Sequence, residues 1–380
     1  MRLAFFNNSL NHHQVNVADE LYKLLGDEYV YITTVASNKI GLKGGANYNT
    51  RPYCLCAGDA SVSKEKALEY ARTADVCIFG ASSLEYAVER AKFDKNALSF
   101  ELSERWLKKG WLNILSPHLL RWWLAYQKYF RSANFYKLNS SAYGAIDHYR
   151  MFSYRNRCYK WGYFTKVENV SKVEAPKQGA STLEITPLMW CARFLRLKHP
   201  ELPVQLAHRL KERGYRFHID MFGSGEELDN TKALIAKLCV EDCVTLRGNL
   251  PNEEILKEMR KHVIFLFTSD RHEGWGAVSN ESMSNGCVLV GSDAIGSIPY
   301  LIQDGVNGLI FKSGSLDSLY TKVKYLLDNP QERLLMSKNG IKTMHSIWSP
   351  SCAAKNLLTL IDDLSNGRDS SIKEGPCSKA

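Results

Sequence analysis

Hydrophobic and polar residues alternate along the chain in blocks whose spacing predicts strands and helices in turn. Short apolar runs bounded by polar residues are typical of buried strands, and apolar residues three and four positions apart indicate helices that bury one face. In the first half the predicted strands are Leu3–Phe6, Tyr29–Val35, Val76–Phe79, Tyr136–Ser140 and Cys158–Phe164, and the predicted helices are Asn16–Leu25, Lys64–Thr73, Glu85–Arg90 and Ala142–Met151. Alternating strands and helices favour a parallel sheet covered on both faces.

The second half repeats this alternation. Its predicted strands are Leu188–Ala192, Phe217–Phe222, Val244–Leu246, Ile264–Thr268, Val288–Gly291, Ile298–Ile302 and Leu309–Phe311. Its predicted helices are Pro200–Arg213, Leu228–Leu238, Asn252–Lys261, Ala277–Ser284, Leu316–Asn329 and Leu335–Ser346. The sequence therefore predicts a second α/β domain of the same class.

The length of 380 residues suits two domains better than one core. We expect a Rossmann-like domain at 1–165, a linker rich in Lys, Glu, Pro and Gly at 166–180, and a second such domain at 181–345. A helix at 350–364 is expected to pack back on the first domain. The Ser-, Gly- and Lys-rich tail at 365–380 is expected to be disordered.

Composition excludes several classes of protein. No apolar run reaches the ~18 residues that span a bilayer, and the N-terminus has the pattern of a first strand, without the small-residue site of a signal peptide. The ten cysteines are scattered, without the paired spacing of a zinc site. These features favour a cytoplasmic protein with reduced thiols and no metal.

Positive charge is concentrated in one segment. The net charge is +9, and no acidic residue stands between Glu104 and Asp147. Lys and Arg alternate there with Trp and Tyr, a composition that suits an anionic membrane surface. The candidate membrane residues are Lys108, Lys109, Trp122 and Trp123. The region from about Trp106 to Phe135 is predicted to be an amphipathic helix broken near Ser116-Pro117. The alternative to a membrane surface is a domain helix whose Trp residues are core. The same composition could bind single-stranded nucleic acid, but no recognised nucleic-acid motif accompanies the segment, so no nucleic-acid partner is expected.

The stretch 273–281, Glu-Gly-Trp-Gly-Ala-Val-Ser-Asn-Glu, is the most informative in the chain. It follows a predicted strand and opens a predicted helix, so Glu273 should lie on the connecting loop and Glu281 about two turns into the helix. Free backbone N–H groups at 274–278 would make an anion site at the helix N-terminus. Two carboxylates beside such a site suit a ligand with a phosphate and hydroxyl groups, such as a nucleotide sugar. Taken singly, each Glu has the simpler explanation of a helix cap or a solvated residue.

An ordered set of motifs in the second half resembles the nucleotide-sugar domain of the GT-B glycosyltransferases, most closely the retaining family 4. The set consists of Cys191-Ala192-Arg193 with Lys198, Phe222-Gly223-Ser224-Gly225, Leu246-Arg247-Gly248, Glu273-Gly274-Trp275-Gly276 with Glu281, and Asp304-Gly305-Val306-Asn307-Gly308. The resemblance covers 185–364 and implies two Rossmann-like parallel-sheet domains that face each other across a cleft. In the first half it is mainly architectural, with Asn11-His12-His13-Gln14 and Lys160-Trp161-Gly162-Tyr163-Phe164 similar to polysaccharide-cluster members.

The resemblance assigns residue roles. It implies that Arg193, Lys198 and Glu273 are catalytic, with the two cations stabilising the departing diphosphate so that no metal is needed. It implies donor binding by Gly223, Gly225, Gly274, Trp275, Gly276, Ala277, Val278 and Glu281. The sequence departs from the family at Ala192, where Gly is usual, and at Tyr300, where a carboxylate is common.

The first domain is expected to hold the acceptor. The stretch Asn7–Gln14, which includes His12 and His13, replaces a glycine turn that is common after the first strand of the family, and its amide and imidazole groups could bind sugar hydroxyls or donor phosphate. Glu101 is a further candidate for the acceptor side of the cleft. Helix capping by Asn11 beside exposed histidines is the alternative for this segment. No general base is assigned, because in a retaining reaction the leaving phosphate can take the acceptor proton.

The resulting hypothesis is a retaining, metal-independent glycosyltransferase. It would use a UDP- or GDP-sugar and a glycan or lipid-linked acceptor in cell-surface polysaccharide synthesis, in the cytoplasm or on the inner face of the membrane. Two alternatives remain: a nucleotide-sugar epimerase of the same fold, and a catalytically silent scaffold that docks partners on a membrane.

Overall fold

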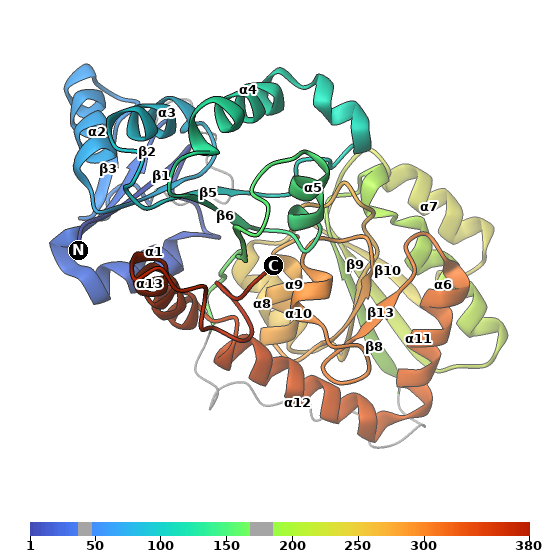
Figure 1. Ribbon diagram of the computed structural model, residues 1–380. Helices are drawn as coiled ribbons and strands as arrows, with labels where there is room; N and C mark the ends of the chain where they lie inside the picture. Colours follow the sequence, from blue (N-terminus) through green and yellow to red (C-terminus); the bar gives the residue numbers. More distant parts are fainter. Residues whose placement is uncertain (37–47, 168–184) are drawn as a thin grey trace. The chain divides into compact units, whose positions relative to one another are not determined.

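The computed structural model of the protein describes residues 1–36, 48–167 and 185–380 (Figure 1). The chain forms two compact units. Unit 1 comprises Met1–Lys166 with Ile347–Ala380, and unit 2 comprises Val167–Ser346. The predicted linker at 166–180 falls almost entirely outside the described residues.

Unit 1 is built on a parallel sheet. Its described residues form seven strands in the order β3-β2-β1-β4-β5-β6-β7, and every neighbouring pair is parallel. The strands are β1 (Leu3–Asn7), β2 (Tyr29–Thr33), β3 (Cys54–Cys56), β4 (Val76–Phe79), β5 (Ser99–Ser103), β6 (Phe135–Asn139) and β7 (Cys158–Lys160). Strand order reverses between β1 and β4, which is the place where ligands bind in open α/β sheets.

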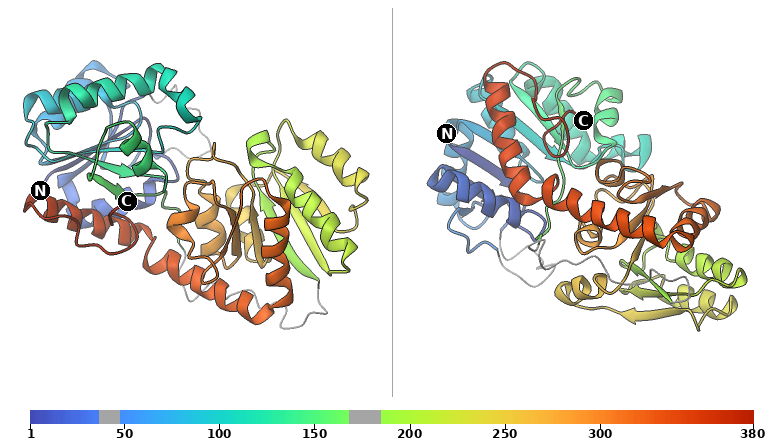
Figure 2. Two further views of the ribbon diagram at one scale, coloured as in Figure 1. Left: turned by 45° about the vertical axis from the view of Figure 1, so that its right-hand side comes forward. Right: turned by 90° about the horizontal axis from the view of Figure 1, so that it is seen from below.

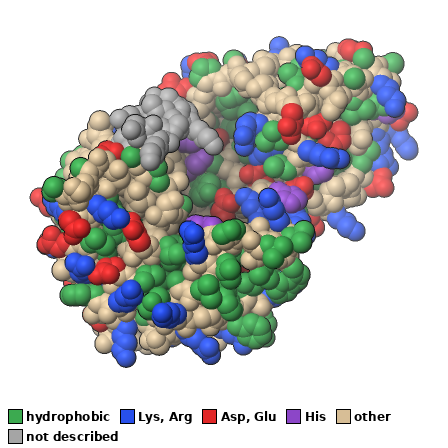
Figure 3. Space-filling model, turned by 90° about the horizontal axis from the view of Figure 1, so that it is seen from above, with side chains coloured by type: hydrophobic (Ala, Val, Ile, Leu, Met, Phe, Trp, Pro, Cys, Tyr) green, Lys and Arg blue, Asp and Glu red, His purple; other side chains and the backbone are tan. Residues whose placement is uncertain are grey.

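Helices cover both faces of this sheet. They are α1 (Val15–Leu25), η1 (Gly26–Glu28), α2 (Ser61–Thr73), α3 (Leu84–Phe93), η3 (Gly110–Leu115), α4 (Pro117–Ala125), η4 (Tyr126–Phe130), α5 (Gly144–Arg150) and α13 (Pro350–Ser365). Figure 2 shows α1 and α13 packed side by side on one face, opposite α2, α3 and α4. Hydrophobic side chains are exposed over η3 and α4 (Figure 3).

The segment after α13 is packed, which corrects the prediction of a disordered tail at 365–380. Cys377 and Ser378 are buried, and the backbone of this segment pairs with the edge strand β7. Lys160 N donates to Ser378 O at 2.8 Å, and Cys377 N donates to Lys160 O at 2.7 Å. Composition predicts disorder because the tail has few apolar residues, but an edge strand offers backbone partners whatever the side chains are.

Unit 2 has a second parallel sheet. Its described residues form six strands in the order β10-β9-β8-β11-β12-β13. These are β8 (Thr186–Cys191), β9 (Phe217–Phe222), β10 (Val244–Gly248), β11 (Ile264–Phe267), β12 (Val288–Ser292) and β13 (Leu309–Phe311). The helices are η6 (Arg196–Lys198), α6 (Glu201–Glu212), α7 (Leu228–Lys237), α8 (Asn252–Met259), α9 (Val278–Ser284), α10 (Ile298–Leu301), α11 (Leu316–Asp328) and α12 (Pro330–Ser346). Strand order reverses between β8 and β11. The strand predicted at Ile298–Ile302 is wrong, because this segment forms the short helix α10, with Pro299 in its first turn.

The two parallel sheets confirm the predicted α/β class, but the apolar pattern does not predict β3 or the central strand β5. The β5 sequence, SFELS, has Glu101 at its centre, a residue that normally argues against a buried strand. The structure buries Glu101 by pairing it with Lys137 on the adjacent strand β6. The predicted helix around 106–135 begins as η3 and is divided at Pro117, because proline fits the first turn of a helix but not its interior.

Candidate active site

The predicted donor residues of unit 2 gather at the carboxyl edge of its sheet. Arg193 follows β8, Gly223 and Gly225 follow β9, and Glu273 follows β11. Because the strands are parallel, their carboxyl ends meet at one edge, and β8 and β11 flank the reversal of strand order. The fold thus brings together residues up to eighty positions apart in sequence.

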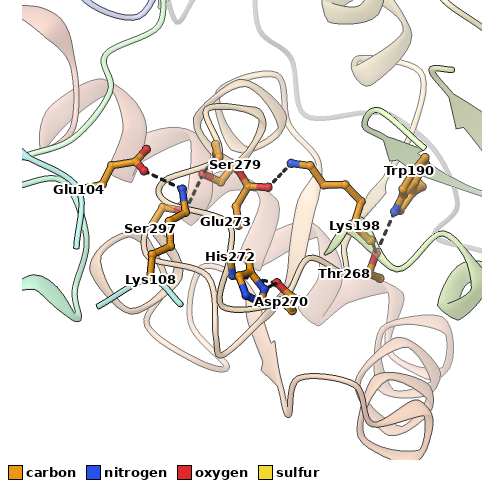
Figure 4. Close-up of polar contacts among 11 residues, drawn as sticks. Glu104, Lys108, Trp190, Lys198, Thr268, Asp270, His272, Glu273, Ser279 and Ser297 are labelled. Atoms are coloured by element: carbon orange, nitrogen blue, oxygen red, sulfur yellow. Dashed lines mark hydrogen bonds and ion pairs between the residues drawn. The ribbon is translucent and has the colours of Figure 1, made fainter. Parts of the chain in front are cut away.

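The loop after β8 and the loop after β11 are joined by an ion pair. The Lys198 ammonium donates to Oε2 of Glu273, and both side chains are largely buried (Figure 4). Thr268, at the end of β11, reinforces the connection, because its hydroxyl donates to the Lys198 carbonyl at 2.7 Å and accepts from Nε1 of Trp190 at 2.9 Å. Lys198 and Glu273 are therefore positioned by the sheet and are not free surface groups.

Arg193 differs from Lys198 in its surroundings. Its side chain is exposed, and within the described residues the structure shows no ion pair or hydrogen bond from its guanidinium. An exposed guanidinium has its five donors available for two phosphate oxygens at once. The neighbouring loop is held by Asp270, whose N–H donates to Leu197 O at 3.0 Å and whose carboxylate lies 3.5 Å from His199 Nε2.

Two glycines press against the backbone of the Arg193 loop. Gly223 has φ +128°, and a Cβ on it would lie 1.9 Å from the Ala192 carbonyl oxygen. Gly225 has φ +153°, and a Cβ there would lie 2.4 Å from the Phe194 carbonyl oxygen. The structure therefore gives these glycines a direct role: they let the loop after β9 approach the residues on either side of Arg193.

The loop that carries Glu273 turns on Gly276. This glycine has φ +77°, and a Cβ would lie 2.3 Å from Cζ of Phe267. Trp275 is fully buried, and its Nε1 donates to Asn280 Oδ1 at 2.8 Å. The Trp275 ring is therefore part of the core, so any contact with a donor at this position would come from its backbone.

Helix α9 begins at Val278, with Ala277 as its N-cap and no side-chain cap. This start places Glu281 about one turn into the helix, not two as the sequence pattern predicts. Oε1 of Glu281 accepts from Asn252 Nδ2 at 3.1 Å. Burial raises the pKa of Glu281 to about 7, and the Asn252 hydrogen bond opposes this shift. Burial, with a contribution from Glu281, raises the pKa of Cys191 to about 12.

Unit 1 has its own pocket of about 500 Å³, at the carboxyl ends of β1, β4 and β5. Asn7 organises it: its Nδ2 donates to Gln14 Oε1 at 2.6 Å, and its Oδ1 accepts from Ala81 N at 3.0 Å. On the opposite wall, Glu104 accepts from the Tyr163 hydroxyl at 2.7 Å. Amides, a carboxylate and the walls provided by Trp106 and Trp122 suit a polyhydroxylated ligand.

Of the three predicted acceptor residues, only Glu101 lines the unit 1 pocket. His12 and His13 do not line this pocket; the His13 ring stacks on Tyr163 with centroids 5.0 Å apart, and burial lowers its pKa to about 3. Burial also lowers the pKa of His12. Glu101 does line the pocket, but from its floor, where its Oε1 accepts from Lys137 Nζ at 2.5 Å.

The comparisons with known proteins bear directly on unit 2. Residues 186–343 match the model of the family described as glycosyl transferases group 1. This match covers less than half of the chain, so it assigns 186–343, which is most of unit 2, to the group 1 glycosyl transferases.

Curated relatives are similar to only part of this chain. The poly(glycerol-phosphate) alpha-glucosyltransferase of Bacillus subtilis (strain 168) is 27% identical over 35% of this chain and 19% of its own length. The amylovoran biosynthesis glycosyltransferase AmsK of Erwinia amylovora is 32% identical over 34% of this chain and 32% of its own length. The alignments thus span a third or less of these relatives.

Solved structures share the whole fold at low identity. A lipopolysaccharide outer core galactosyltransferase, WaaB, aligns with a TM-score of 0.71 at 15% identity, over 95% of this chain and 99% of that one. The Anabaena protein Alr3699/HepE, in complex with UDP, aligns with a TM-score of 0.69 at 14% identity, over 95% of this chain and 100% of that one. Together with the two parallel sheets, these likenesses show the predicted GT-B fold.

The structure divides the candidate membrane residues of this transferase. Trp122 is 4% exposed and belongs to the core of unit 1, which corrects its assignment to a membrane surface. Trp123 is half-buried, and its Nε1 donates to Met151 O at 2.9 Å. Lys108 pairs with Glu104 at 2.9 Å, whereas Lys109 is exposed. Among the described residues, no helix is both long and apolar enough to cross a bilayer.

Sequence reasoning missed several residues that line the unit 1 pocket. Glu104 and Arg105 follow β5, a strand that the apolar pattern does not predict. Arg105 pairs with the buried Asp147 through two hydrogen bonds of 2.9 and 3.1 Å. These residues could have been predicted from the polar residues that directly follow each strand, such as Asn7, because such residues lie at the carboxyl edge of a parallel sheet.

Proposed function

We propose that the protein is a retaining glycosyltransferase that moves a sugar from a nucleoside diphosphate sugar to a glycan or lipid-linked acceptor without a metal ion. The observation that carries the proposal is the Lys198–Glu273 pair, set beside the exposed Arg193 at the carboxyl edge of the unit 2 sheet. The match of 186–343 to the model of the group 1 glycosyl transferases supports it.

The arrangement suits the charge changes of glycosyl transfer. As the bond from the anomeric carbon to the diphosphate oxygen breaks, negative charge grows on the diphosphate, and the Arg193 guanidinium and Lys198 ammonium stabilise it. In this proposal Glu273 accepts hydrogen bonds from the donor sugar, and Glu281 accepts them from the ribose. A new bond forms from the anomeric carbon to the acceptor oxygen, whose proton passes to the leaving diphosphate.

Known relatives guide the choice of donor and acceptor. The complex of Alr3699/HepE with UDP supports a uridine nucleotide over a guanosine nucleotide. The names of the Bacillus, Erwinia and WaaB relatives support a cell-surface polymer as the product. We assign the acceptor to the unit 1 pocket, whose amides and carboxylate match the hydroxyl groups of a saccharide.

A thermal-shift panel with UDP, GDP, ADP, CMP and the corresponding nucleotide sugars tests the donor site. Specific binding raises stability with the logarithm of ligand excess over the dissociation constant. We expect uridine compounds to stabilise the wild type, and Arg193→Ala and Glu281→Ala to lose most of this shift. The matched control is Arg213→Ala, an exposed arginine after α6, at the amino edge of the same sheet.

A transfer assay then separates the alternatives. Transfer that depends on an added saccharide acceptor and is lost in Arg193→Ala supports the proposal. Release of a free isomerised sugar without an acceptor would identify an epimerase. No stabilisation by any nucleotide, with no transfer, would favour a catalytically silent scaffold.

A further inference from the structure

Unit 1 exposes a group of large apolar side chains on η3, α4 and the turn after α5. Leu115, Leu112 and Trp111 on η3 are 80%, 74% and 59% exposed. Leu120 and Leu124, one turn apart on α4, and Phe152, just after α5, are exposed as well. We name these six residues the η3–α4 face; Figure 3 shows hydrophobic side chains gathered on this side of unit 1.

The three segments form one continuous surface. An apolar hollow of about 210 Å³ lies between them, lined by Ile114, Leu119, Leu120, Trp123, Arg150, Met151 and Phe152. The hydrogen bond from Trp123 Nε1 to Met151 O fixes α4 beside the turn after α5. Leu119 also lines the unit 1 pocket, so the hollow and that pocket share a wall.

The exposed charges on the segments that form this face have a single sign. Lys109, Arg121 and Arg150 are exposed, and Arg150 lines the hollow itself. The sequence has no acidic residue between Glu104 and Asp147, and Asp147 is buried against Arg105. A mixed-charge protein surface would therefore place some of its cations against these cations, whereas a uniformly anionic surface offers each of them a partner.

Apolar exposure on this scale is unusual in a monomeric protein and marks an interaction surface. Leu and Trp beside Lys and Arg, without acidic residues, are the composition of helices that lie in the interface of an anionic bilayer. We propose that the η3–α4 face docks unit 1 on a membrane that contains anionic phospholipid. Leu112 and Leu115 enter the bilayer below the headgroups, while Lys109, Arg121 and Arg150 meet the phosphates. The apolar hollow takes part of an acyl chain.

Vesicle flotation of the full chain tests this proposal without any need for catalysis. The vesicles are phosphatidylcholine alone and phosphatidylcholine mixed with phosphatidylglycerol. We expect the wild type to partition to the anionic vesicles at least tenfold more strongly, with the preference lost at high salt. Leu112→Ser/Leu115→Ser should lower partitioning by tenfold or more, and Lys109→Ser/Arg121→Ser should remove the preference for phosphatidylglycerol.

The matched control is Leu24→Ser/Val62→Ser, which removes exposed apolar residues from α1 and α2. It should float as the wild type does. All variants change exposed positions, and an unchanged thermal unfolding curve verifies that each is folded.

Depth quenching gives a second readout. Brominated phosphatidylcholine in the anionic vesicles should quench part of the wild-type tryptophan fluorescence. The quenched part should fall in Trp111→Phe, which keeps an apolar ring for insertion, and the remainder should come from Trp123, which lines the hollow. Equal flotation of wild type and Leu112→Ser/Leu115→Ser, or no flotation of the wild type, would overturn the proposal. So would a concentration-dependent dimer that this double variant abolishes, because the face would then bind a second copy of the chain.

Discussion

The ammonium of Lys198 lies against the carboxylate of Glu273 and joins the loops that follow two adjacent strands, β8 and β11. A donor diphosphate would meet a cation that already has an acidic partner. The pair therefore holds Lys198 in place before the donor arrives, so little reorganisation is needed when charge develops on the diphosphate.

We expect Lys198→Ala to lower kcat by about 10²–10³, the loss that follows removal of one preorganised group that stabilises developing charge. Lys198→Arg should retain part of the activity, because the charge remains while the geometry changes. Steady-state kinetics of both variants, beside Arg213→Ala, would measure the effect. A wild-type kcat in Lys198→Ala would remove Lys198 from the catalytic set.

The raised pKa of Glu281 predicts that this residue destabilises the ligand-free protein in a pH-dependent way. Its pKa is about 7 in the folded protein and 4.5 ordinarily, so between these values the folded state binds more protons than the unfolded state. The free energy of unfolding from this group therefore falls as pH rises through that window. Glu281→Gln removes the penalty and should gain on the order of 1–2 kcal/mol over the wild type at pH 8, with little gain near pH 4.5. Urea unfolding at several pH values measures the difference; a constant difference across this range would contradict it.

The affinity for the donor should also depend on the ionisation of Glu281, but it should rise with pH where the free energy of unfolding falls. If ribose hydroxyls donate to Glu281, the carboxylate must be ionised, so affinity for a nucleotide sugar should rise by roughly tenfold between pH 6 and 8. A nucleotide sugar is the suitable probe, because its diphosphate is esterified at both ends and does not titrate in this range. The rise should be absent in Glu281→Gln, and calorimetric titration at each pH would detect it.

The tight packing of Gly223 predicts that adding one methyl group at this position lowers stability strongly. In Gly223→Ala the new Cβ would meet the Ala192 carbonyl, so the loop that carries Arg193 must move, at an expected cost of about 2–3 kcal/mol together with weakened nucleotide binding. The control is Gly214→Ala, where φ is +73° but nothing lies within 4 Å of the new Cβ. That variant should lower the free energy of unfolding by about 1 kcal/mol and leave nucleotide binding unchanged. Equal behaviour of the two variants in thermal unfolding and binding would contradict the packing role.

The buried pair of Glu101 and Lys137 should be strongly coupled. Burial lowers the pKa of Lys137, and the adjacent Glu101 carboxylate opposes this shift. Breaking the pair with Lys137→Met leaves a buried carboxylate without a cation, although Trp106 and Ser103 still donate to it, and should cost about 3–5 kcal/mol. The double variant Glu101→Gln/Lys137→Met should recover part of the loss, and a double-mutant cycle in denaturant measures the coupling. Additive losses would show that the two charges do not depend on each other.

Local pattern was sufficient for much of the architecture. The bounds predicted for Phe217–Phe222 and Val76–Phe79 agree with β9 and β4, because a short apolar run between polar residues reflects a strand buried on both faces. The position of Glu273 on a loop between strand and helix was also predictable, since Gly-Trp-Gly interrupts the apolar periodicity there.

The sequence by itself determined the two α/β units and the motif order by which unit 2 resembles the group 1 glycosyl transferases. Tertiary structure decided which charged residues are paired inside the protein and which apolar residues remain outside. Glu101 is in a central strand only because Lys137 neutralises it, and Trp122 is core while Leu115 is exposed, although both occur in one basic, apolar segment. The tail is ordered because β7 is an edge strand. Each outcome depends on a partner distant in sequence, and local periodicity contains no information about that partner.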